Sequence, residues 1–113
     1  MWSSSSQRES LARYGDVVVF DLTYKTNSLK LPLAAFVGTD NHGKTVVFAL
    51  ALQLDETAPT MQWLFEQFKD LCSSSCSSLR TIFTDDDDAI ALAVSRVFPS
   101  AIHRLCVWHL GQN

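Results

Sequence analysis

The sequence DVVVFDLTY, residues 16–24, decides the fold, and this apolar run also contains an acidic residue, Asp21. Its β-branched and aromatic residues favour a β-strand that is buried on both faces. Two similar runs follow, LPLAAFVGT at 31–39 and TVVFALALQL at 45–54. The turn between them, DNHG at 40–43, is typical of a β-hairpin, because Asn and Gly tolerate the positive φ that such turns require. These residues predict three antiparallel strands.

The pattern of apolar residues then changes to that of a helix. One face of this helix consists of Met61, Leu64, Phe65, Phe68 and Leu71. Pro59 suits its first turn. A fourth strand at 79–84, a second helix at 85–98 and a fifth strand at 102–108 are expected next. Strands that alternate with helices pair in parallel through right-handed crossovers. One mixed α/β sheet in the order 3-2-1-4-5, with two crossover helices, satisfies both kinds of pairing; this is the RNase H-like arrangement.

Length and charge limit the possible functions. The 113 residues, 47% of them hydrophobic, allow at most one domain with a packed core. Residues 1–13 are polar and Ser-rich and are expected to form an irregular lead-in to a domain at 14–113. The net charge is −3 and the nine Lys and Arg residues are scattered, which argues against a stand-alone DNA-binding module. No run approaches the roughly 18 to 20 apolar residues of a membrane span, so no membrane partner is expected.

Two carboxylates stand at positions where a fold gains nothing from burying them. Asp21 lies inside the first strand, and Asp85 follows the fourth strand directly. In the expected sheet these strands are parallel neighbours about 4.8 Å apart, so the two side chains are expected to converge near the carboxyl ends of the strands. Adjacent carboxylates repel each other, and a divalent cation such as Mg²⁺ or Mn²⁺ would relieve that repulsion.

A structural role for the same residues is an open alternative. Asp21 would then cap a turn near a strand end, and Asp85 would be the N-cap of the second helix. Asp86, Asp87 and Asp88 are expected to stabilise the first turn of that helix through its dipole. Such roles need no cation.

Cysteine and histidine residues suggest a second, weaker metal site. Cys106 and His109 have the spacing of zinc ligands but supply half of a tetrahedral site, which Cys72 and Cys76 would have to complete. The alternative for Cys106 and His109 is a buried thiol and a hydrogen-bonded imidazole. The two other histidines, His42 in the hairpin turn and His103 at the start of the fifth strand, are expected at the surface.

Several segments, in order, resemble the MULE (Mutator-like element) transposase domain, as also found in plant far-red-impaired-response proteins. The similarity runs from about residue 14 to the end of the chain. The segments that carry it are FDLTYKTN (20–27), LPLAAFVGTDNHGKTVVFALAL (31–52), DETAPTMQWLFEQF (55–68), TDDDDAI (84–90) and VFPSAIHRLCVWHL (97–110).

The resemblance implies part of a DDE-type transposase core, with Asp21 and Asp85 as its first two catalytic carboxylates and Cys106 and His109 as a family motif. It implies Mg²⁺ or Mn²⁺ as cofactor, DNA as partner in the intact protein, and a nuclear location. The third acid, a Glu, is expected beyond Asn113, so we expect the isolated chain to bind metal weakly and to be inactive. The alternative is a domesticated nuclear regulator that uses the fold as an interaction scaffold. Self-association is not predicted either way.

Overall fold

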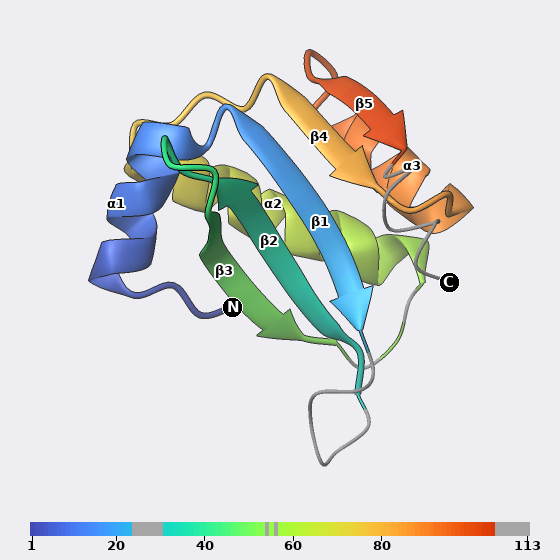
Figure 1. Cartoon of the computed structure of the whole chain (residues 1–113). Coiled ribbons are helices and arrows are strands. Elements are labelled where there is room, and N and C mark those ends of the chain that lie inside the picture. Colours follow the sequence, from blue (N-terminus) through green and yellow to red (C-terminus); the bar gives the residue numbers. More distant parts are fainter. Residues whose placement is uncertain (24–30, 54, 56, 106–113) are drawn as a thin grey trace.

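The computed structural model describes residues 1–23, 31–53, 55 and 57–105. One five-stranded sheet with the strand order β3-β2-β1-β4-β5 forms its centre (Figure 1), as the sequence predicts. Its elements in chain order are α1 (Ser5–Tyr14), β1 (Val17–Thr23), β2 (Leu33–Thr39), β3 (Thr45–Leu52), α2 (Ala58–Ser74), β4 (Thr81–Thr84), α3 (Asp88–Val97) and β5 (Ile102–Leu105). The first three strands pair antiparallel, whereas β4 is parallel to both β1 and β5. The parts of the predicted strands at residues 24, 54 and 106–108 lie outside the described residues.

The hairpin between β2 and β3 forms at the predicted turn. Gly43 has a φ of 78°, a left-handed conformation that glycine adopts without a steric penalty. Asp40 Oδ1 accepts hydrogen bonds from the backbone N–H groups of His42 at 2.8 Å and Lys44 at 2.9 Å. The turn is therefore stabilised by its own side chain as well as by the glycine.

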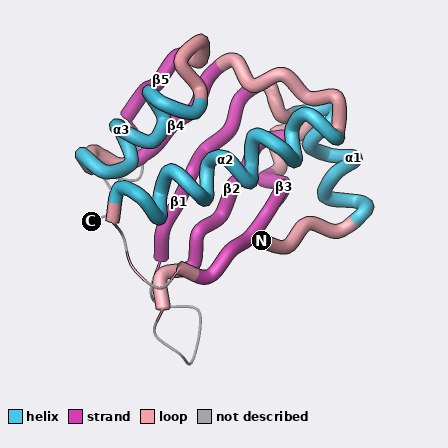
Figure 2. The backbone as a smooth tube through the Cα atoms, turned by 180° about the vertical axis from the view of Figure 1, so that it is seen from behind, coloured by secondary structure: helices cyan, strands magenta, loops and turns pink. Residues whose placement is uncertain are grey.

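The sheet differs from expectation in how it is covered. Among the described elements, α2 and α3 both lie against one face, as the views from the two sides show (Figures 1 and 2). On β1, Val18 and Phe20 point toward these helices and are buried, whereas Val17 on the opposite face is 43% exposed. The prediction that this strand is buried on both faces is therefore wrong, because the covering helices are on one side.

Aromatic side chains form much of the core between the sheet and the helices. Phe36 of β2 stacks on Phe68 of α2 with ring centroids 4.0 Å apart. Phe20 of β1 lies 5.0 Å from Phe36 and 4.8 Å from Phe65 of α2, both in tilted arrangements. Such pairs add to the free energy gained by burying the rings. Through this cluster α2 packs against β1 and β2.

The N-terminal residues are ordered, which corrects the expected irregular lead-in. Ser4 caps α1, since its hydroxyl accepts from Gln7 N at 3.1 Å while Gln7 Oε1 accepts from Ser4 N at 2.8 Å. Leu11 of this helix is completely buried. Ahead of the helix, Trp2 exchanges two backbone hydrogen bonds with Leu50 of β3, at 2.7 and 3.0 Å. The segment therefore covers the outer edge of β3 and contributes to the core.

Candidate functional site

Asp21 lies within the central strand, on the sheet face away from α2 and α3. Its backbone is opposite Ala35 of β2, and its neighbour Phe20 points into the core. Because side chains alternate along a strand, the carboxylate of Asp21 belongs to the uncovered face. The residue is half-buried, although its Oδ1 atom is buried. A strand interior therefore holds this carboxylate with little freedom of the backbone.

Asp85 directly follows β4 and continues its alternation. Thr84 is completely buried on the helix-covered side of the sheet, and Asp85 is half-buried. The alternative role of Asp85, as the N-cap of the following helix, is wrong. Helix α3 begins at Asp88, and its N-cap is Asp87, whose Oδ1 accepts from Ile90 N at 3.0 Å. Capping therefore does not account for an acidic residue at position 85.

The strand register brings these two positions to the same level. In the parallel pair of β1 and β4, Val19 is the partner of Phe83. Two residues further along each strand are Asp21 and Asp85, so the register continued by two residues sets them side by side. Neighbouring strands are about 4.8 Å apart, and both side chains follow the alternation of the same sheet face. Two carboxylates side by side are a suitable pair of oxygen ligands for Mg²⁺ or Mn²⁺.

A complete metal site is not formed by the described residues. Across residues 1–23, 31–53, 55 and 57–105, no three His, Cys, Asp or Glu side chains come together in a group that could hold a metal ion. Cys72 is buried in the core whereas Cys76 is exposed, so the two thiols lie in different surroundings. Cys106 and His109 lie outside the described residues. Of the predicted site residues, the structure therefore describes Asp21 and Asp85.

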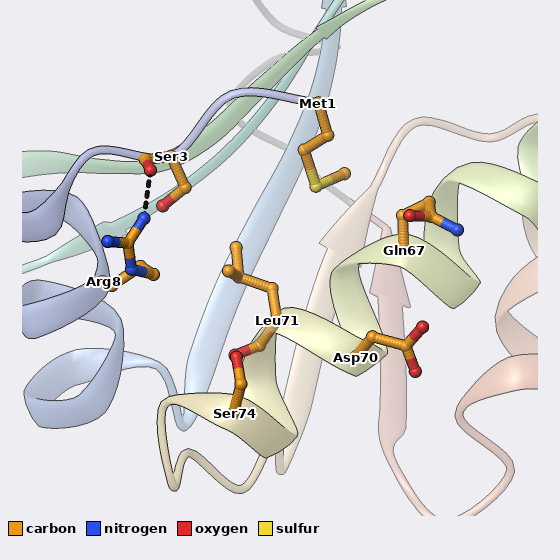
Figure 3. A pocket seen from close by; sticks show the side chains of 7 residues that line it. All are labelled: Met1, Ser3, Arg8, Gln67, Asp70, Leu71 and Ser74. Carbon is orange, nitrogen blue, oxygen red and sulfur yellow. Dashed lines mark hydrogen bonds between the residues drawn. The ribbon is translucent and has the colours of Figure 1, made fainter.

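A cavity elsewhere on the molecule gives a weaker chemical indication of function. A cavity of about 410 Å³ lies between α1 and α2, and Arg8 and Asp70 are its charged residues (Figure 3). The Arg8 guanidinium already donates to the backbone oxygen of Ser3. Since the cation that would attract an anionic ligand is already engaged by the chain, the cavity gives no indication of function.

His103 is the residue near the carboxylates whose role was missed. It was expected at the surface, but it is half-buried, and its Nε2 lies 2.6 Å from the hydroxyl oxygen of Thr84. Burial lowers the pKa of His103 below its ordinary value. In the parallel pair of β4 and β5, His103 is the partner of buried Ile82. A lone histidine in a short strand did not reveal which residue it would contact.

The site lies within a region that matches a known family. The model of the MULE transposase domain matches residues 17–113, which include both aspartates. The chain belongs to the MULE transposase domain family. In this MULE domain Asp21 lies on β1, and Asp85 directly follows β4.

Plant proteins are among the relatives of this MULE domain. Protein FAR1-RELATED SEQUENCE 5 of Arabidopsis thaliana is 37% identical over 109 residues, covering 96% of this chain and 14% of that protein. Protein FAR-RED IMPAIRED RESPONSE 1 of the same plant is 33% identical over 109 residues, covering 96% of this chain and 13% of that protein. The chain therefore spans about one-seventh of the length of these relatives. None of its described helices is both long and apolar enough to cross a membrane.

Proposed function

We propose that this MULE domain supplies the first two carboxylates of a cation-dependent site that cuts and joins DNA in a longer, DDE-type transposase with an RNase H-like core. The observation that supports the proposal is the parallel register of β1 and β4, in which Val19 pairs with Phe83; continued by two residues, this register would bring Asp21 level with Asp85. A third ligand would complete the site in the intact protein. The nucleus, where DNA is available, is the expected location.

The two aspartates would have complementary tasks in such a site. When bound, divalent cations activate the attacking oxygen and stabilise the leaving oxygen of a phosphodiester. Asp21, held inside the central strand, would fix the position at which a cation is bound. Asp85 would bind the same cation. It lies between β4 and α3, outside the regular strand, so its backbone could adjust to the other ligands of the cation.

A second function is a domesticated derivative that has kept the fold as an interaction scaffold. The observation that favours it is that the relatives described above are named for a far-red response and not for transposition. Such a protein would retain the sheet and helices but would not need to bind a cation. The two functions therefore differ in the behaviour of Asp21 and Asp85 toward metal.

Thermal unfolding with and without Mn²⁺ tests the carboxylate pair. We expect millimolar Mn²⁺ to raise the melting temperature, because the cation binds the folded chain and the unfolded chain lacks the site. Asp21→Asn should raise the melting temperature of the metal-free protein, since two like charges about 4 Å apart near a protein surface repel by on the order of 4 kcal/mol. The same change should abolish the effect of Mn²⁺, and Asp85→Asn should abolish it too.

Asp70→Asn is the matched control. Asp70 is an exposed aspartate on α2, and this helix covers the sheet face opposite to that of Asp21. This variant should keep the full response to Mn²⁺. If Asp21→Asn instead lowers the melting temperature and Mn²⁺ leaves the wild type unchanged, Asp21 has a structural role and the scaffold function is favoured.

A further inference from the structure

His103 and Thr84 form a hydrogen-bonded link that leads to Asp85. Thr84 is completely buried at the end of β4, and its hydroxyl has two contacts. It donates to the backbone oxygen of Asp85 at 3.0 Å, and it lies 2.6 Å from Nε2 of His103. His103 belongs to β5, whose parallel pairing with β4 sets it opposite Ile82, two residues before the level of Thr84.

The chemistry of the hydroxyl determines the direction of these bonds. A threonine hydroxyl has one hydrogen to donate and two lone pairs that accept. If that hydrogen goes to the Asp85 carbonyl, the bond with His103 requires a proton on Nε2, which His103 then donates to the Thr84 oxygen. Both contacts are satisfied together in this tautomer of the neutral ring. The lowered pKa of His103 is consistent with a neutral ring at pH 7.

The backbone at Asp85 is where such a link has an effect. The ladder of β4 ends at Thr84, and α3 begins at Asp88 with Asp87 as its cap, so Asp85 lies between two regular elements. A hydrogen bond to its carbonyl limits rotation about the backbone there. That rotation determines where the carboxylate lies relative to Asp21.

We propose that His103 is a positioning residue that, through the Thr84 hydroxyl, orients Asp85 for cation binding. The inference rests on the proposed function in taking Asp85 as a cation ligand. Groups that orient a ligand in this way commonly affect metal affinity by about 10–100-fold when they are removed. Since this link reaches Asp85 through its backbone, we expect the low end of that range.

Nuclear magnetic resonance of the metal-free chain tests the link directly. The ring nitrogen shifts of His103 should report the proton on Nε2. His103→Leu should move the carbonyl and carboxylate carbon resonances of Asp85, as should Thr84→Val, which keeps the shape of the side chain but removes the hydroxyl. His103→Gln should leave them close to wild type, because its amide nitrogen can donate from a position similar to that of Nε2.

Titration with Mn²⁺, followed by electron paramagnetic resonance, tests the effect on the site. His103→Leu and Thr84→Val should weaken Mn²⁺ binding roughly tenfold, and His103→Gln should restore most of the affinity. His42→Leu is the control, since His42 is exposed in the hairpin turn and should have no effect. Urea unfolding of each variant identifies any loss of affinity that is due to loss of the fold.

The possible failures can be told apart. If wild type binds Mn²⁺ but a folded His103→Leu binds it equally well, or His103→Gln is as weak as His103→Leu, the positioning role is wrong. If wild type and Asp85→Asn bind Mn²⁺ alike, the proposed function fails. In that case the resonances of Asp85 still decide whether His103 orients it, and unchanged resonances in His103→Leu overturn the inference.

Discussion

Asp21 and Asp85 show how the meaning of a residue depends on its neighbours in space. Asp21 lies inside a strand, and Asp85 directly follows one, where capping of the next helix is the common role. The register of β1 and β4, continued by two residues, brings them level, and Asp87, not Asp85, caps the following helix. Asp85 is therefore not the N-cap of α3. Cation binding by the pair stays a prediction, which the Mn²⁺ experiment tests.

Cys72 gives a prediction about pH at the same scale. Burial in the core raises the pKa of its thiol from 9.0 to about 12. In the unfolded chain the thiol loses its proton as the pH rises past 9, whereas in the folded chain it stays protonated until about 12. Ionisation therefore favours the unfolded state in this interval, and we expect the free energy of unfolding to fall as the pH rises from 9 to 12.

Urea unfolding across this pH range measures the effect. Lysines and tyrosines titrate there as well, so the comparison is between wild type and Cys72→Ala. The variant should lose stability less steeply with pH, while Cys76→Ala, at an exposed thiol, should follow wild type. Equal slopes for wild type and Cys72→Ala would show that the thiol is not withdrawn from water.

At the scale of elements, α1 is the helix whose contribution the sequence did not reveal. We expect Leu11→Ala to destabilise the protein by about 2–5 kcal/mol, because removing a completely buried leucine side chain leaves a cavity. Leu92→Ala, the same change in α3 at a position that is 40% exposed, should cost less than about 1 kcal/mol. Urea unfolding of both variants measures the difference. Similar losses would mean that α1 does not pack on the sheet in solution.

At the scale of the whole molecule, charge limits how these residues can meet DNA. With a net charge of −3, the chain has no excess of cations to replace the counterions of a duplex. We expect non-specific affinity at physiological salt to be weaker than the roughly 10⁻⁴ M limit that is usual for DNA-binding proteins. Fluorescence anisotropy with a labelled duplex, at low and at physiological salt, measures this. Micromolar binding at physiological salt would show that the scattered lysines and arginines form a basic face after all.

The sequence alone determined the order of the elements from β1 to β5 and the topology of the sheet. Apolar alternation, helical spacing and turn residues such as Gly43 are local signals, and the rule of right-handed crossovers converts their order into one strand arrangement. The candidate carboxylates were found in the same way, because Asp21 interrupts one apolar run and Asp85 directly follows an expected strand.

Tertiary structure alone decided what depends on contacts between distant segments. Helix α1 is Ser-rich and buries a single leucine, so its sequence has no apolar stripe that would predict it. Leu11 is buried because elements that come later in the chain pack against it. One sheet face is uncovered by the described helices because α2 and α3 pack on the same side, which strand composition does not reveal. His103 meets Thr84 because β5 pairs with β4 in a particular register. Register and packing depend on the whole chain at once, so local residue patterns could not specify them.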